Sequence, residues 1–142
     1  MHILLTRPIE DCQNLILRFK SLGHTVSHLP LIKIKKKNYD PINFSEFNCL
    51  IFTSSNAVKN LNLKEINKNI ACFCVGNATE KTALSFGFQN VFSAEGNVSN
   101  LKELILQNIN SKDGKLLYIS GETVSYDLDK DLIKEGYSIK RV

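Results

Sequence analysis

The sequence predicts an α/β protein built on a parallel β-sheet, and three observations carry this prediction. Short apolar runs alternate with helical apolar patterns along the whole chain, as strand–helix–strand crossovers require. The runs at residues 49–52 and 69–75 are apolar on both faces, which is typical of strands covered by helices on two sides. Hydrophobic residues make up 43% of the 142 residues and charged residues 23%, which indicates an ordinary globular composition.

The first unit is predicted to be a strand, a helix and a second strand. Residues 2–6 form a short apolar run, and Pro8 follows it at a position where a helix start tolerates proline. The helical pattern that comes next ends at Gly23. Residues 24–34 form an extended run interrupted by Pro30, which favours a sheet edge or a junction of two strands. A unit this small cannot bury both faces of its sheet, so we expect it to be incomplete.

The second unit, residues 39–138, is predicted to fold as one flavodoxin-like sheet in three layers. Its strands are expected at 49–52, 69–75, 90–93 and 115–120, with one more beginning at 137. Helices are expected between these strands. Asn77 and Glu80 have the spacing of a capping box, in which two side chains bind each other's backbone amides at a helix start.

The charge pattern excludes some partners. The net charge of +4 is compatible with an anionic ligand but does not demand one. Lys33, Lys35, Lys36 and Lys37 lie on an alternating strand pattern, which indicates a solvated strand face; a nucleic-acid surface would need more basic residues and interleaved aromatics. The N-terminus has no basic leader and no apolar run could span a membrane, so we expect a cytoplasmic protein without a membrane or nucleic-acid partner.

The four cysteines predict structural thiols and no metal site. Cys12 falls in a helical pattern, whereas Cys49, Cys72 and Cys74 fall in apolar strand runs. A metal site would need Cys-x-x-Cys spacing with further cysteine or histidine ligands, and that pattern is absent. We expect reduced, buried thiols, which suit a reducing cytosol.

Three loops that follow predicted strands and precede predicted helices are the candidate binding sites. Ligands of open α/β sheets bind outside the carboxyl ends of the strands, where helix N-termini offer free N–H groups to anions. The candidate residues of these loops are Thr53, Ser54, Ser55, Asn56, Gly76, Asn77, Ala78, Thr79, Gly121 and Glu122. The same residue types also serve as ordinary helix caps, so each loop taken alone leaves that alternative open.

Familiar catalytic and cofactor patterns are missing from the sequence. No loop matches a phosphate-binding loop or a dinucleotide-binding glycine pattern, so no cofactor is expected. His2, His24 and His28 lie in or beside predicted strands and suggest no catalytic pair with a serine or cysteine. The aspartates within 127–131 alternate along a predicted helix, so they do not share one face as metal ligands would.

A series of short motifs nevertheless has an informative order. They are Leu5-Thr6-Arg7-Pro8, Leu29-Pro30-Leu31-Ile32, Phe52-Thr53-Ser54-Ser55-Asn56-Ala57-Val58, Val75-Gly76-Asn77-Ala78-Thr79 and Tyr118-Ile119-Ser120-Gly121-Glu122. Each motif is weak alone. In this order and spacing the chain resembles the uroporphyrinogen-III synthase family along its whole length, and the third and fourth motifs are the most specific.

The resemblance implies a particular domain arrangement. The family has two flavodoxin-like lobes, one inserted into the other and joined by a two-stranded ladder. On that template residues 1–32 open the discontinuous lobe, 33–38 are the outgoing ladder strand, 39–138 are the inserted lobe and 139–142 start the return strand. The rest of the first lobe would lie beyond Val142, so we expect a truncated member that is inactive alone. The full-length protein would be a monomer, and this fragment a paired or swapped dimer.

The resemblance also implies a reaction. The family's enzymes are lyases of heme biosynthesis that cyclise hydroxymethylbilane, a linear tetrapyrrole with many carboxylates, with inversion of the terminal ring and loss of water. Because the task is to hold the substrate in one folded conformation, no metal or cofactor is implied. The loop residues named above would bind the substrate carboxylates, Arg7 would face the cleft from the first lobe, and Thr79 is the candidate for a direct role in turnover.

The alternative reading is a non-catalytic, flavodoxin-like module that binds anions or regulates a partner. A phosphoryl-receiver module would need paired acidic residues after the first strand and an aspartate after a later one. The chain has Thr6 and Arg7 at the first position and Thr53 at the second, which disfavours that form of the alternative.

Overall fold

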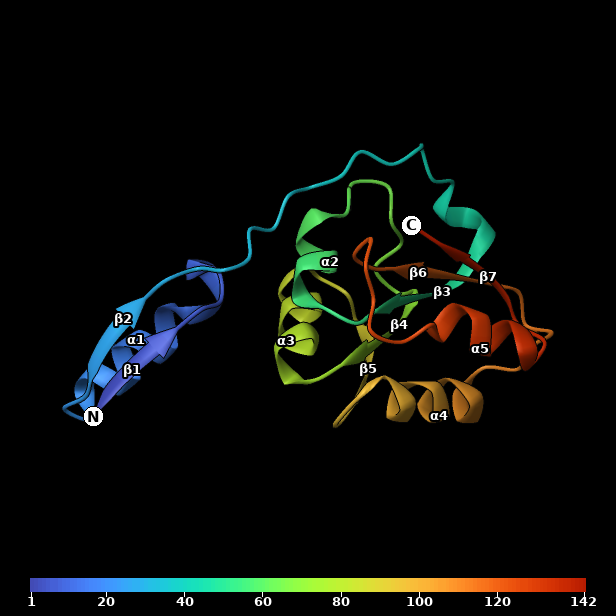
Figure 1. Cartoon of the computed structure of the whole chain (residues 1–142). Helices are drawn as coiled ribbons and strands as arrows, with labels where there is room; N and C mark the ends of the chain where they lie inside the picture. Colours follow the sequence, from blue (N-terminus) through green and yellow to red (C-terminus); the bar gives the residue numbers. More distant parts are fainter. The chain divides into compact units, whose positions relative to one another are not determined.

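The computed structural model describes residues 1–142, which divide into two compact units (Figure 1). Unit 1 comprises Met1–Asn38 and unit 2 comprises Tyr39–Val142. No helix in either unit has the length and apolar character needed to cross a membrane.

Unit 1 is the predicted strand, helix and strand. It consists of β1 (His2–Leu5), α1 (Ile9–Ser21) and β2 (Thr25–His28), and the two strands pair in parallel. Exposed and half-buried residues alternate along both strands, because α1 covers only one face of the sheet. Cys12 is the single buried residue of the unit. The unit therefore leaves one face of its sheet without a covering helix; that it is part of a larger lobe stays a prediction.

The ladder strand expected at residues 33–38 is absent. Residues 29–43 form no helix and no strand, so the long extended run predicted from residue 24 to 34 is regular only as far as His28. A strand needs a partner for its backbone N–H and C=O groups. The amides of Leu29 and Leu31 donate to the carbonyls of Leu5 and Thr6, both at 2.9 Å, and no strand pairs with the residues after them. Four of the five residues at 33–37 are lysines, which favours a hydrated stretch over a sheet strand.

Unit 2 is a five-stranded, fully parallel sheet. Its strands are β3 (Phe47–Phe52), β4 (Ala71–Val75), β5 (Asn90–Ala94), β6 (Lys115–Ile119) and β7 (Ser138–Arg141). Its helices are η1 (Phe44–Glu46), α2 (Ser55–Asn60), α3 (Asn77–Ser85), α4 (Val98–Asn108) and α5 (Leu128–Lys134). The parallel α/β prediction is confirmed for this unit.

The strand order corrects the flavodoxin-like label. The order across the sheet is β5-β4-β3-β6-β7, which reads 3-2-1-4-5 when the strands of the unit are counted from β3. The flavodoxin order is 2-1-3-4-5, and 3-2-1-4-5 is the beginning of the Rossmann order. The sequence could not separate the two, because both arise from the same alternation of strands and helices. The point where the order reverses lies between β3 and β6.

The core has two halves, one on each face of the sheet. Leu50, Phe52 and Leu117 point to the face covered by α2 and α3, where they pack with Val58 and Ala83. The alternate residues of the same strands point to the other face, where α4 and α5 lie. Helices on both faces make a three-layer unit and explain why the central strands are apolar throughout.

Residues 139–142 are not the start of a ladder strand. β7 pairs in parallel with β6 and forms the edge of the sheet, so the second unit extends to Val142 and does not end at residue 138. Ile139 and Arg141 are half-buried, and Ile139 packs against the half of the core that contains α4 and α5. The family template suggested a linker strand here, whereas the alternation of exposed and half-buried residues is that of an edge strand packed on one side.

The buried thiols allow a prediction about pH. Burial raises the pKa of Cys49 and of Cys72 to about 12, from an ordinary value of 9.0. Since the folded-state pKa lies above the unfolded one, this stabilising effect is complete below pH 9 and is lost between pH 9 and about 12. We expect the free energy of unfolding, measured in urea, to fall above pH 9 by up to about 1.4 kcal/mol per pH unit for each thiol.

The rates at which the buried cysteines are alkylated compare the stability of unit 1 with that of unit 2. Iodoacetamide at pH 8 is expected to leave Cys49 and Cys72 unmodified until the protein is unfolded, whereas Cys12 should react first. Cys12 is as buried as the others, at 1% exposed, but it lies in the smaller unit. Peptide mass spectrometry measures each rate, and equal rates at Cys12 and Cys49 would contradict the expected difference between the units.

Candidate functional site

The three predicted loops come together at the carboxyl edge of the unit 2 sheet. Phe52, at the end of β3, is level with Cys74 of β4 and with Ile119 of β6. Because all strands are parallel, the segments that follow these residues emerge at the same edge. Two of the loops, after β3 and after β6, lie on either side of the point where the strand order reverses, which is where ligands of open α/β sheets bind.

The loop after β3 combines a cap with a contact to β6. The Ser54 hydroxyl accepts a hydrogen bond of 3.2 Å from the Asn56 amide. Ser54 therefore caps α2, which is the ordinary helix-cap role left open by the sequence. Ser55 and Asn56 are the first residues of that short helix. The Thr53 hydroxyl lies 3.3 Å from the hydroxyl of Tyr118, which joins this loop to the next-to-last residue of β6.

The loop after β4 leaves backbone donors uncapped. Gly76 is the N-cap of α3 and no side chain caps the helix, so the capping box predicted for Asn77 and Glu80 is wrong. The Gly76 carbonyl instead accepts hydrogen bonds from the amides of Thr79 and Glu80, at 3.1 and 3.2 Å. The amides of Asn77 and Ala78 lie at the exposed first turn, where the helix offers them no acceptor.

Gly76 needs its glycine for the backbone conformation. Its φ is +78°, a region that other residues rarely adopt, and its amide donates to the Ala94 carbonyl at 3.0 Å. A Cβ at this position would meet no atom within 4 Å, so the space beside Gly76 is open. Thr79 follows in the first turn of α3 and is 4% exposed, the one buried polar residue of the chain. An uncapped helix start with open space beside it is suited to an anionic group.

The loop after β6 is held by Arg141, a residue that the sequence did not single out. The guanidinium donates from Nε to the Ser120 hydroxyl at 2.7 Å, and from Nη2 to the carbonyls of Gly121 and Glu122 at 2.9 and 3.1 Å. Its central carbon also lies 5.9 Å from the ring centre of Tyr118. In the sequence Arg141 resembles any charged residue of an edge strand, so only the fold reveals these contacts.

Arg7 belongs to unit 1 and is described with that unit alone. It is exposed, just after β1, and its carbonyl accepts a hydrogen bond of 2.8 Å from the Nε2–H of His28. Its predicted position opposite the three loops stays a prediction.

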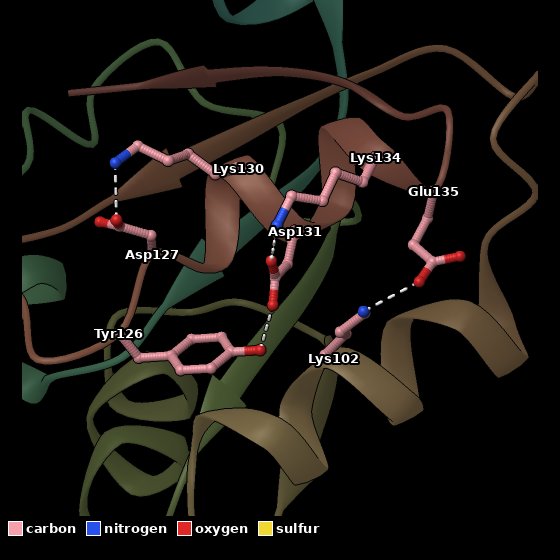
Figure 2. Close-up of polar contacts among 7 residues, drawn as sticks. All are labelled: Lys102, Tyr126, Asp127, Lys130, Asp131, Lys134 and Glu135. Atoms are coloured by element: carbon pink, nitrogen blue, oxygen red, sulfur yellow. Dashed lines mark hydrogen bonds and ion pairs between the residues drawn. The ribbon is translucent and has the colours of Figure 1, made fainter.

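The charged side chains of α4 and α5 form a separate surface cluster (Figure 2). Lys102 pairs with Glu135 at 2.9 Å, and Lys134 pairs with Asp131 at 3.0 Å. The Tyr126 hydroxyl also donates to Asp131, and these hydrogen bonds lower the pKa of the Asp131 carboxyl, that from Tyr126 having the larger effect. The cluster joins two helices on the surface of the unit. No three histidine, cysteine or acidic residues of the chain gather as metal ligands would.

Comparison with known proteins identifies the family. The family model described as uroporphyrinogen-III synthase HemD matches residues 13–142. The chain belongs to the uroporphyrinogen-III synthase family. None of the curated proteins compared with the chain matches it. The family resemblance predicted from the ordered motifs is confirmed.

Solved structures of uroporphyrinogen-III synthase agree with this assignment. The enzyme from Helicobacter pylori is 26% identical, with a TM-score of 0.52 over 74% of this chain and 49% of that one. A mutant enzyme from Thermus thermophilus is 13% identical, with a TM-score of 0.62 over 100% of this chain and 60% of that one. The wild-type enzyme from the same organism is 15% identical, with a TM-score of 0.53 over 99% of this chain and 59% of that one. The Thermus likenesses bear on the fold alone, and the chain spans about half to three fifths of the length of these enzymes.

Proposed function

We propose that the protein is a uroporphyrinogen-III synthase, a lyase that cyclises hydroxymethylbilane with inversion of the terminal pyrrole ring and loss of water, in heme biosynthesis. Membership of the family is the observation that carries the proposal. Without an enzyme the same substrate closes to the uninverted isomer, so catalysis has to fix one folded conformation of the linear substrate.

The carboxyl edge of the unit 2 sheet supplies what such positioning needs. The substrate carries many carboxylates, and the start of α3 offers the amides of Asn77 and Ala78 together with the positive end of the helix dipole. Open space beside Gly76 lets a carboxylate approach the backbone. Thr53, Ser54, Ser55, Asn56, Gly121 and Glu122 are proposed to line the same site, with Arg7 contributing from unit 1.

Backbone donors at this edge explain why no familiar catalytic side chains are required. Amides held by the sheet do not reorganise when charge develops, and so they stabilise a folded, ring-closing geometry as well as the bound substrate. The dehydration step leaves a reactive linear intermediate, and holding its two ends together accelerates ring closure over escape. Water leaves the substrate's terminal carbon in that step, and the proposal assigns no cofactor to it.

Replacing Thr79 by valine tests the proposed role of the hydroxyl in turnover. The hydroxyl makes no hydrogen bond within the protein although Thr79 is only 4% exposed, so Thr79→Val should leave the melting temperature unchanged. A lost hydrogen bond to a carboxylate predicts a fall of roughly tenfold or more in kcat/KM of the full-length protein. Thr82→Val is the control, because the Thr82 hydroxyl donates to the Ala78 carbonyl within the helix, at 2.8 Å. Unchanged kcat/KM in Thr79→Val would reject the role.

The decisive experiment for the function is a separation of product isomers. The full-length protein is incubated with hydroxymethylbilane generated enzymatically, and the oxidised products are resolved by chromatography. We expect the inverted isomer in excess over the product of a protein-free reaction. Only uninverted product would reject the proposal and leave a non-catalytic, anion-binding module as the function of this fold.

The proposal also covers the oligomeric state of the protein and its cellular location. Unit 1 exposes the apolar side chains of Leu4, Leu17, Leu22, Leu31 and Ile32, the last two at 72% and 60%. We propose that this chain pairs through unit 1, which would cover them. The full-length protein is proposed to be a monomer. All four cysteines are buried free thiols, which supports a reducing, cytoplasmic location.

A further inference from the structure

The contacts of Arg141 tie one strand to the candidate site. Arg141 lies at the end of β7 and is half-buried. Three of its hydrogen bonds go to the loop after β6: one to the Ser120 hydroxyl at 2.7 Å and two to the carbonyls of Gly121 and Glu122, at 2.9 and 3.1 Å. Backbone pairing continues past β7 as well, since the Ser120 amide donates to the Val142 carbonyl at 3.0 Å. The planar, forked guanidinium can bridge several acceptors at once, which an ammonium group cannot do.

These bonds fix the direction of the loop's amides. In a trans peptide the C=O and N–H groups point in opposite directions. The Glu122 carbonyl is drawn toward the guanidinium, so the Thr123 amide of the same peptide is turned away from it. Thr123 is exposed, and its amide donates to no backbone carbonyl of the protein. Arg141 therefore leaves the Thr123 amide as a backbone donor with no protein acceptor, in a loop at the carboxyl edge of the sheet.

The same residue is linked to the loop after β3. The guanidinium lies over the ring of Tyr118, which is 1% exposed, and the Tyr118 hydroxyl meets the Thr53 hydroxyl at 3.3 Å. A path of direct contacts thus runs from β7 through β6 to the loop on the other side of the reversal in strand order. Loss of the guanidinium would release both the loop after β6 and one side of the Tyr118 ring.

We propose that Arg141 is a positioning residue: it holds the loop after β6 so that its amides face the carboxylates of the substrate. The inference rests on the proposed function, because it assigns the freed amide to that polycarboxylate ligand. Arg141 acts through the loop, and its guanidinium is stabilised by a cation–π contact with the ring of Tyr118.

The test compares Arg141→Met and Arg141→Lys with Lys140→Met. Lys140 precedes Arg141 in β7 but is exposed on the other side of the strand, so its replacement removes a charge without touching the loop. Arg141→Met should raise KM roughly tenfold and change kcat by less than about twofold, as expected when binding common to substrate and transition state is lost. Arg141→Lys should recover little of this, because a single ammonium cannot bridge three acceptors. Lys140→Met should leave both constants unchanged.

Amide hydrogen exchange gives a readout that does not depend on activity. In Arg141→Met the amides of Glu122 and Thr123 should exchange faster, while those of β3 and β4 keep their protection. Unchanged exchange in the loop, or an unchanged KM despite faster exchange, would overturn the proposal. Equal losses in Lys140→Met, or a lowered melting temperature that accounts for the loss, would assign Arg141 a purely structural role and overturn it too. Failure of the proposed function is distinguishable, since it would appear in the unaltered full-length protein as uninverted product.

Discussion

A chain of residues 39–142 alone is expected to unfold cooperatively with most of the stability of unit 2, whereas residues 1–38 alone are expected to hold no stable structure. Unit 2 has a covered five-stranded sheet and a core on each face. Unit 1 buries one residue, Cys12, and has a two-stranded sheet with a single helix. Chains below about 40 residues rarely bury enough apolar surface to fold without additional support.

Circular dichroism in urea measures both expectations, and light scattering on the intact chain measures pairing. The intact chain should show slow amide exchange in β3, β4 and β6 and fast exchange in β1 and β2 when it is diluted to a monomer. Protection of β1 and β2 should rise with protein concentration, because pairing would cover the exposed side chains of unit 1. A concentration-independent monomer with well-protected β1 and β2 would contradict this account.

The buried strands were predictable because a strand covered on both faces is apolar at every position. Leu50, Ile51 and Phe52 are completely buried and alternate between the two faces of the sheet, and no surface strand tolerates three such residues in succession. The order of the strands has no comparable pattern in the sequence. It depends on which side each crossover packs, and the flavodoxin and Rossmann orders use the same local sequence patterns.

Some features of the candidate site were likewise predictable from the sequence, and others were not. The loops after β3, β4 and β6 were predictable from composition, because the carboxyl ends of buried parallel strands meet at one edge. The start of α3 was not, since the spacing of Asn77 and Glu80 fits a capping box and only the positive φ of Gly76 selects the glycine as the cap. Arg141 was missed because its partners are one side-chain hydroxyl and two carbonyls about twenty residues earlier, and backbone acceptors carry no sequence signal.

Substitution of Gly114 by alanine is expected to destabilise unit 2 through both the backbone conformation and the displacement of a neighbouring side chain. Asn48 bulges out of β3 where the register with β6 shifts between Phe47 and Cys49, and its side chain lies against Gly114. A Cβ on Gly114 would lie 2.0 Å from the Asn48 Oδ1 atom, and the glycine also has a φ of +121°. The backbone conformation costs roughly 1–2 kcal/mol. Displacing Asn48 adds at most about 1 kcal/mol, the low end of overpacking costs, because the Cβ meets only the free end of an exposed side chain. The expected total is about 1–3 kcal/mol.

Two comparisons separate these costs in urea unfolding experiments. Gly87→Ala meets no atom within 4 Å at a φ of +91°, so it should cost only the conformational part, about 1–2 kcal/mol. Asn48→Ala removes the exposed side chain that Gly114→Ala would strike, so the double variant should lose most of the overpacking cost. The bulge at Asn48 in β3 and Gly114 before β6 would then depend on each other, and together they allow the shift in register between these two strands. If Gly114→Ala costs no more than Gly87→Ala, the bulge does not depend on that glycine.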